Sequence, residues 1–218
     1  ITGKCLVMVT DDAERTMITF LGASEALSAR EIDQSVLVDS EWFYVEGYLV
    51  TDEARTLAIK TAVDAAKANN VKVAVSLSDP LVVTVFGDEL CEVIGGGVDL
   101  IFCNKDEAMA FTGTASLEAA AESLKQYTKT FAITDGAEGA ITFDGRSMHQ
   151  SEGVEATAVD TNGAGDMFAG AFLYAITAGR DYAWAADLAN DCAARVVAQF
   201  GPRLEAQQFD NIKTQFGI

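Results

Sequence analysis

Segments with the pattern of a β-strand and segments with the pattern of an α-helix alternate along most of this chain. The run from Val71 to Leu77 is short, apolar and rich in β-branched residues, which is typical of a strand buried in a parallel sheet. Before it, from Asp52 to Asn69, small apolar residues recur at the spacing of a helix. This alternation predicts an α/β fold, doubly wound, with a mostly parallel sheet flanked by helices.

The other segments fit the same scheme. The first is a hairpin of two strands, Lys4–Val9 and Thr16–Leu21, around a polar turn. Further strands are expected at 41–45, 99–103, 130–134 and 155–159, with a hairpin around 144–145. Further helices are expected from 104, at 116–127, and at 164–177 and 182–199, the last two closing the chain. No repeat or proline-rich linker occurs, so one domain is expected, spanning 1–218.

Charge and composition exclude several classes of function. The 15 basic and 33 acidic residues give a net charge of −18, which repels nucleic acid and anionic membrane surfaces. No apolar run approaches the roughly 18 residues of a membrane span. A phosphate-bearing ligand must therefore be held by local contacts rather than by a general basic field.

The cysteines and the histidine offer little chemistry. Cys5, Cys91, Cys103 and Cys192 form no CxxC pair and stand in apolar surroundings, which favours reduced, buried thiols in a cytoplasmic protein. His149 is the only histidine, lies in a polar, turn-rich stretch, and cannot build a metal site alone. A surface position is expected for it.

The strongest motif is Asp160-Thr161-Asn162-Gly163-Ala164-Gly165-Asp166, between an apolar strand and a helix of small residues. Its glycines let successive N–H groups point at one spot, where the helix dipole also favours an anion. A carboxylate there, Asp166, is suited to accepting a proton from an attacking hydroxyl. Alternatively, these residues form only an Asx-turn and a helix N-cap.

DTNGAGDMFAGAF resembles the C-terminal signature of the ribokinase-like (PfkB) kinase family, especially its adenosine-kinase-like branch. The resemblance implies ATP-dependent phosphoryl transfer to a hydroxyl of a nucleoside or a sugar. It also implies that Asp166 is the general base and that the amides of Gly163, Ala164 and Gly165 form an anion hole. Whether a monovalent cation binds beside residues 160–162 is left open.

Two further motifs allow both a structural and a functional interpretation. Asn104 and Glu107 have the spacing of a helix capping box, and the resemblance places the family's NxxE motif, tied to Mg²⁺ and phosphate, at this position. Gly136 and Gly139 could be turn residues only. By resemblance, Thr134, Gly136 and Gly139 line the nucleotide, and Asn190 lies near its adenine.

The N-terminal hairpin, about 4–22, resembles part of the family's small β lid, and residues from about 36 to 218 resemble its nucleotide-binding core. By resemblance Arg15 reaches toward substrate and phosphates, although a plain surface turn is the alternative. Family members carry a further N-terminal part with most acceptor-contacting residues, which is expected to be missing here. The chain as given should then bind ATP weakly and phosphorylate almost nothing. Unpaired lid strands favour association, for instance as a homodimer.

The sequence gives less support to other functions. A P-loop kinase would need GxxxxGK[ST], and a dinucleotide-binding fold would need GxGxxG at an early turn, whereas Phe168 stands where the third glycine belongs. The remaining alternatives are a non-catalytic nucleotide-binding module and a kinase for a fructose- or ribose-type sugar. The identity of the phosphate acceptor is open at this stage.

Overall fold

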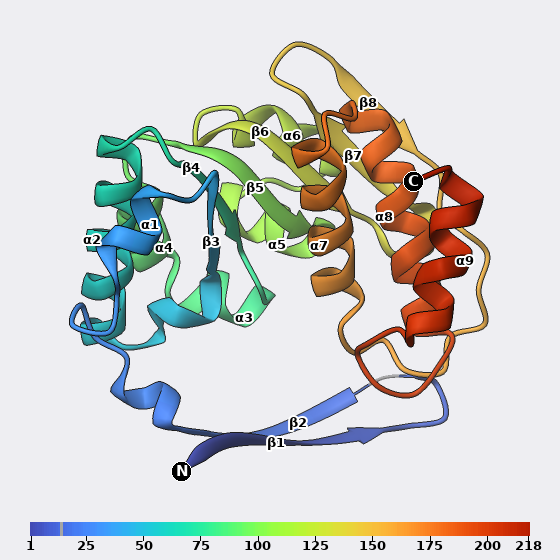
Figure 1. Ribbon diagram of the computed structural model, residues 1–218, viewed down its shortest axis with the longest axis horizontal. Coiled ribbons are helices and arrows are strands. Elements are labelled where there is room, and N and C mark those ends of the chain that lie inside the picture. Colours follow the sequence, from blue (N-terminus) through green and yellow to red (C-terminus); the bar gives the residue numbers. More distant parts are fainter. Residues whose placement is uncertain (14) are drawn as a thin grey trace. The chain divides into compact units, whose positions relative to one another are not determined.

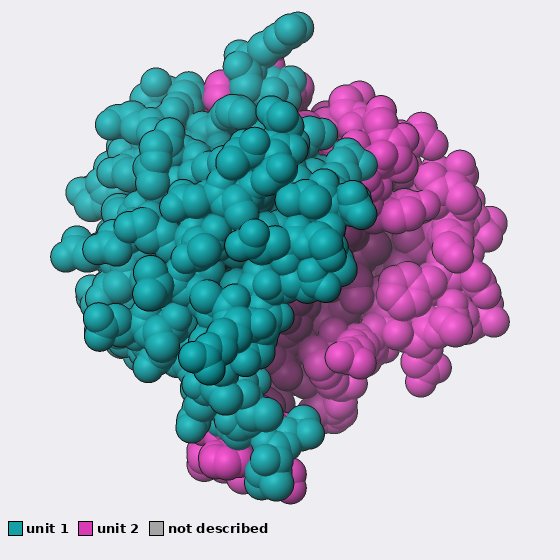
Figure 2. Space-filling model, turned by 60° about the vertical axis from the view of Figure 1, so that its left-hand side comes forward, with its two compact units in different colours: residues 1–2, 21–133, 144–146 teal, residues 3–20, 134–143, 147–218 magenta. Residues whose placement is uncertain are grey.

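The computed structural model describes residues 1–13 and 15–218 (Figure 1). They form two compact units, which Figure 2 draws in separate colours. Unit 1 contains Ile1–Thr2, Leu21–Ile133 and Asp144–Arg146. Unit 2 contains Gly3–Phe20, Thr134–Phe143 and Ser147–Ile218. Each is described by itself below.

Unit 1 alternates strands and helices. Its strands are β3 (Trp42–Glu46), β4 (Lys72–Ser76), β5 (Val98–Asn104) and β6 (Thr128–Thr134, the last residue belonging to unit 2). Its helices are α1 (Gln34–Val38), α2 (Glu53–Ala68), α3 (Pro80–Val85), α4 (Gly87–Ile94), α5 (Lys105–Thr112) and α6 (Leu117–Leu124), with 3₁₀ turns η1 (Ala23–Ala26) and η2 (Gly47–Thr51). β3 pairs in parallel with β4, and β4 with β5, so that Val75 lies opposite Val45 and Ile101.

Helix α2 shows how sequence sets these elements. The Asp52 carboxylate caps it by accepting from the amides of Ala54 and Arg55. Its inner side is buried against β3 and β4; the side chains on that side include Ala58, Ile59, Ala62, Val63 and Ala66. Burying each Val or Ile side chain contributes about 1.5–3 kcal/mol, which outweighs the weak propensity of short helices.

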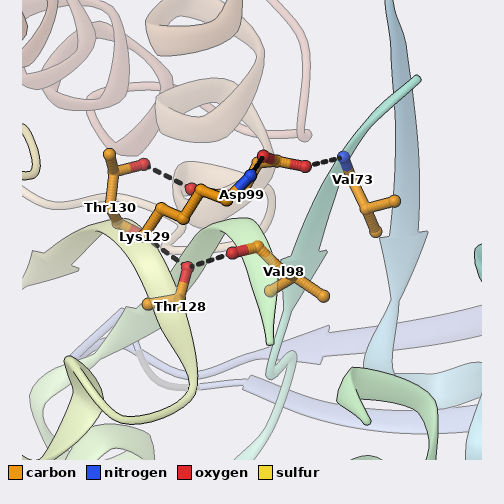
Figure 3. A network of polar contacts seen from close by, with 6 residues as sticks. All are labelled: Val73, Val98, Asp99, Thr128, Lys129 and Thr130. Atoms are coloured by element: carbon orange, nitrogen blue, oxygen red, sulfur yellow. Dashed lines mark hydrogen bonds and ion pairs between the residues drawn. The ribbon is translucent and has the colours of Figure 1, made fainter. Parts of the chain in front are cut away.

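A polar network holds the start of β5 to its neighbours (Figure 3). The Asp99 carboxylate accepts from Val73 N at 2.8 Å and from Lys129 Nζ at 2.7 Å, while Thr130 Oγ1 donates to the Asp99 carbonyl at 2.7 Å. Thr128 Oγ1 donates to the Val98 carbonyl at 3.3 Å. This fixes the amino end of β5, and its carboxyl end delivers Asn104 to the opposite edge.

Unit 2 holds most of β1 (Thr2–Val9) and β2 (Arg15–Gly22), which form their own two-stranded sheet, and the antiparallel pair β7 (Ala140–Phe143) and β8 (Met148–Ser151). It also holds the 3₁₀ turn η3 (Gly136–Glu138) and helices α7 (Ala164–Thr177), α8 (Tyr182–Val197) and α9 (Ala206–Phe216). α7 packs against α8, and Phe172 of α7 lies edge-on to Tyr182 of α8 at 5.0 Å; within α7, Phe172 also stacks 5.9 Å from Phe168.

The strands β3 to β8 run in chain order through one six-stranded mixed sheet. The expected α/β fold, with a mostly parallel sheet flanked by helices, is confirmed. Among the described residues, no helix is long and apolar enough to cross a membrane.

Some expected elements were wrong. Residues 155–159 form no strand, although Thr157 and Val159 are β-branched. Their side chains are mostly exposed, and the amide of Val159 donates to the carbonyl of Val197 at the end of α8. A segment without a strand beside it gains nothing from β propensity. Three helices rather than two close the chain, because α9 follows α8.

The expectation of four buried thiols was half wrong. All four cysteines are unpaired, but only Cys103 and Cys192 are buried, and Cys5 and Cys91 are exposed. Cys5 stands on the hairpin strand β1, where most side chains face solvent, and Cys91 lies on the outer side of α4. Burial raises the pKa of Cys192 to about 11, so this thiol stays protonated at neutral pH.

Candidate active site

The loop of residues 160–166 turns into α7 at Gly163. Gly163 is the N-cap of α7 and has the left-handed angles φ 80° and ψ 2°. A Cβ atom there would lie 2.5 Å from Pro202 Cβ and 2.8 Å from the Pro202 carbonyl oxygen. Both the backbone angles and the close approach of Pro202 therefore require glycine at this position.

A buried carboxylate sets the start of the same loop. Asp160 is 4% exposed, and its two carboxylate oxygens accept from Asn162 N and Gly201 N, each at 2.9 Å. The first contact makes a tight Asx-type turn. The second ties the loop to the segment that carries Pro202.

The amides at the start of α7 are available to a ligand. α8 is capped by the Asp181 side chain, whereas α7 has no side-chain cap. Ala164 N makes only a long contact, 3.4 Å, to the Thr161 carbonyl, and within the described residues the amides of Gly163, Gly165 and Asp166 have no acceptor. Free amides at a helix N-terminus favour an anion.

Asp166 lies in the first turn of α7, and its side chain is exposed. A carboxylate in this position is stabilised by the helix dipole and accessible to a reactant. The structure thus places an exposed carboxylate in the first turn of a helix that has no side-chain cap, and the role of Asp166 as general base stays a prediction.

Arg15 reaches this loop from the hairpin. Its Nη1 donates to Thr161 Oγ1 at 2.8 Å, and Thr161 Oγ1 donates to the carbonyl of Ala13 at 3.3 Å. Arg15 and Thr161 belong to unit 2 although 146 positions separate them. In the sequence, Thr161 stands out only as part of the 160–166 motif, and no separate role for it is apparent.

The turn after β6 is closed by its own backbone. Asp135 N donates to the Gly139 carbonyl at 2.8 Å, and η3 fills the interval. A Cβ on Gly139 would lie 2.1 Å from the Ser151 carbonyl oxygen, and one on Gly153 would lie 1.9 Å from the Ala137 carbonyl oxygen. Gly136, by contrast, has open space around it and a φ of 55°. The turn that carries Gly136 and Gly139 is thus pressed against residues 151–153, and Thr134 enters it from β6.

The side chain of Asn190 also contacts residues 151–153, through Ser151 and Glu152. It is 7% exposed, and its Nδ2 donates to Ser151 Oγ at 2.9 Å and to the Glu152 carbonyl at 3.1 Å. Ser151 Oγ in turn donates to the Asp187 carboxylate. The structure therefore brings Asn190 and Gly139 onto one segment, residues 151–153, which the sequence did not single out.

In unit 1, Asn104 and Glu107 form a reciprocal capping box at the start of α5. Glu107 N donates to Asn104 Oδ1 at 2.8 Å, Asn104 N donates to Glu107 Oε2 at 2.9 Å, and Asn104 Nδ2 donates to Glu107 Oε1 at 2.7 Å. The helix capping box that the spacing of Asn104 and Glu107 predicts is thus formed. It does not exclude a ligand on the remaining lone pairs.

Glu107 is buried to an unusual degree for a carboxylate, with 5% of its surface exposed. Burial raises its pKa from the usual 4.5 to about 7, the Asn104 amide opposes this, and the charges of Asp79 and Asp106 add to it. A nearby cation would favour the charged form of Glu107 and so lower its pKa again.

The pKa of Glu107 predicts how folding stability depends on pH without metal. Between the unfolded value of 4.5 and the folded value of about 7, the folded state holds a proton that the unfolded state releases. Stability should therefore fall as pH rises through this window, by up to about 3 kcal/mol from this group. Urea unfolding from pH 4.5 to 8 with a chelator should show this loss for the native protein and not for Glu107→Gln. Parallel stability curves for the two proteins would contradict the assignment.

The donor set of Asn104 and Glu107 fits a magnesium ion held through water. Each carboxylate oxygen of Glu107 accepts one hydrogen bond from Asn104 and keeps lone-pair capacity. Mg²⁺ prefers oxygen ligands and keeps several waters, so few protein ligands suffice. The described residues contain no cluster of three or more His, Cys, Asp or Glu side chains that could hold a metal alone.

Within each unit, then, the expected residues come together in groups. Unit 2 joins Arg15 to the 160–166 loop, and joins Asn190 to the turn of Gly136 and Gly139 through residues 151–153. Unit 1 holds Asn104 and Glu107. Each group lies where a strand ends or a helix begins, which is the usual place for ligands in α/β sheets.

Several known proteins are similar to this chain in sequence or structure. The profile described as "pfkB family carbohydrate kinase" matches residues 1–208. Adenosine kinase of Saccharomyces cerevisiae is 28% identical over 227 residues, covering 97% of this chain and 66% of that protein. Ribokinase of Lactococcus lactis is 39% identical over 80 residues, covering 37% of this chain and 26% of that protein. The crystal structure of adenosine kinase from Sinorhizobium meliloti is 33% identical with a TM-score of 0.92, covering 98% of this chain and 66% of that one.

Proposed function

The chain belongs to the pfkB family of carbohydrate kinases, and from this premise we propose that its protein transfers the γ-phosphoryl group of ATP to a hydroxyl of a nucleoside. The chain spans 66% of the length of the yeast adenosine kinase it matches, so the activity is proposed for the whole protein. The observation that carries the proposal is the amide-lined start of α7 with Asp166 in its first turn.

In the proposed reaction the acceptor hydroxyl oxygen attacks the γ-phosphorus. The bond between that phosphorus and the bridging oxygen breaks, ADP leaves, and the hydroxyl proton passes to the Asp166 carboxylate. The exposed position of Asp166 lets an acceptor reach it. Proton removal by a positioned carboxylate contributes typically 10²–10⁴-fold to such rates.

The amides of Gly163, Ala164 and Gly165 would hold the charge that spreads over the transferring phosphoryl oxygens. They are fixed beforehand by Asp160 and by Pro202, so no reorganisation is needed when charge develops. Arg15 adds a full positive charge beside this loop, in a chain whose net charge is −18. A planar guanidinium suits phosphate oxygens.

The nucleotide would lie along the turn of Thr134, Gly136 and Gly139. The open space around Gly136 allows a ligand to approach its backbone closely. Asn190 supports this region by holding residues 151–152. A magnesium ion, if held by Asn104 and Glu107 through water, would neutralise phosphate charge.

Replacing Glu107 by Gln should raise the Mg²⁺ concentration needed for half-maximal rate by about tenfold or more, the usual effect of losing a residue that orients metal-bound water. Gln also serves in a capping box, so the helix should still form. The measurement is initial rate against Mg²⁺ at saturating ATP, with the exposed Glu122→Gln as control. An unchanged Mg²⁺ dependence with a lowered melting temperature would show that Glu107 serves only as a cap.

Two other functions compete. A fructose- or ribose-type sugar as acceptor is supported by the family description and by the ribokinase relative. A non-catalytic nucleotide-binding module would use the same phosphate contacts without turnover. The deciding experiment measures ADP formation by the purified full-length protein with ATP, Mg²⁺ and, in turn, adenosine, ribose and fructose. Adenosine-dependent ADP formation supports the proposal; dependence on a sugar alone or ATP binding without turnover overturns it in favour of the corresponding alternative.

A further inference from the structure

Resting on the proposed kinase function, we infer that Thr161 is a positioning residue that sets the guanidinium of Arg15 beside the amides of the 160–166 loop. The inference starts from two contacts that share one atom. Thr161 Oγ1 accepts from Arg15 Nη1 at 2.8 Å and donates to the Ala13 carbonyl at 3.3 Å. All three residues lie in unit 2.

The chemistry of a hydroxyl explains this arrangement. A threonine hydroxyl carries one hydrogen and two lone pairs. Because the Ala13 carbonyl can only accept, the hydrogen of Thr161 points to it and a lone pair faces Arg15. Valine, which has the same shape, can make neither contact.

The Ala13 carbonyl is itself held in place. Ala13 is 2% exposed, has a positive φ of 64°, and its N–H donates to the Thr10 carbonyl at 2.9 Å. A non-glycine residue in this conformation costs free energy unless its surroundings require it. The hairpin turn therefore presents this carbonyl to Thr161 in a fixed direction.

On the other side, the backbone of Thr161 is fixed by its neighbour in sequence. Asp160 is anchored by Asn162 N and Gly201 N, and Gly163 two residues on is wedged against Pro202. Thr161 thus joins a rigid loop to a residue of the hairpin. Its side chain determines where the positive charge of Arg15 lies relative to the loop amides.

The contact uses one of the five N–H donors of the guanidinium, so capacity for phosphate oxygens remains. An arginine side chain that is not held loses considerable rotamer entropy when it binds a ligand. Because the hydrogen bond to Thr161 already restricts the Arg15 side chain, less rotamer entropy is lost when the phosphate binds. The expected consequence is a higher rate of transfer rather than a more stable fold.

The test is a double-mutant cycle in the full-length protein with ATP and the acceptor that the wild type uses. Thr161→Val should lower kcat about tenfold, the order expected for a hydrogen bond to a charged group, and Thr161→Ser should restore most of that loss. In an Arg15→Ala background, Thr161→Val should cost less than a further twofold. Thr177→Val is the matched control, since the Thr177 hydroxyl bonds only to its own helix, at the carbonyls of Leu173 and Tyr174.

Equal losses in the presence and absence of Arg15, or no recovery with Thr161→Ser, would overturn the inference. If Thr161→Val unfolds, as circular dichroism would show, Thr161→Ala enters the cycle in its place with the same two criteria. Failure of the proposed function is a separate outcome: the wild-type protein would then show no acceptor-dependent ADP formation. In that case the same cycle is run on ATP affinity, where additive effects would equally reject the role of Thr161.

Discussion

Asp166→Asn should lower kcat by roughly 100-fold or more while ATP still binds, because the amide of Asn cannot accept the hydroxyl proton. The side chain is exposed, and the loop before it is held by Asp160 and Pro202 rather than by Asp166. Folding stability should therefore change little. Turnover with the working acceptor and ATP affinity by calorimetry measure the two effects separately.

The control for that variant is Asp210→Asn on α9, where the carboxylate is exposed and lies 4.0 Å from Lys213. This variant also removes one negative charge, but at a position outside the loop. If the Asp166 variant turned over at the wild-type rate, this carboxylate could not be the base. A matched loss in the Asp210 variant would point to an effect of net charge instead.

Gly163→Ala should abolish activity and destabilise unit 2. A side chain at φ 80° costs about 1–2 kcal/mol, and its Cβ would collide with Pro202 at 2.5 Å. Relief requires the loop or the 201–202 segment to move, which displaces the amides that hold the phosphoryl group. We expect a loss of at least about 2 kcal/mol in the free energy of unfolding.

Gly170→Ala on the same helix provides the contrast. Nothing lies within 4 Å of a Cβ at this position, so alanine should stabilise α7 by roughly 0.5–1 kcal/mol and leave turnover as it is. Urea denaturation and the kinase assay on both variants test the pair. Full activity in a stable Gly163→Ala protein would show that the position of this turn does not matter for function.

The sequence predicted the parts of the site that depend on local chemistry. The glycine-rich turn before α7, the capping box of Asn104 and Glu107, and the hairpin each rest on residues a few positions apart. Local backbone preference and hydrogen bonding decide such features, and both can be inferred from a short string. Most strands of the sheet and several of the helices were predicted for the same reason, whereas α1, α3, α4 and α9 were not.

Contacts between distant residues could not be predicted in this way. Nothing in the string links Thr161 to Arg15, 146 positions away, or Gly163 to Pro202. The error at residues 155–159 has a related cause, since β propensity is realised only where a neighbouring strand offers a partner. The roles of the site residues stay predictions until the variants are measured.

The interlocked glycines 139 and 153 limit how this protein can respond to mutation. The atoms that exclude a Cβ there belong to the main chain, at the carbonyls of Ser151 and Ala137. No shortening of a neighbouring side chain can make room, because no side chain is in the way. A genetic selection that starts from alanine at position 153 should therefore return glycine by reversion and find no suppressor through side-chain truncation at 137 or 151.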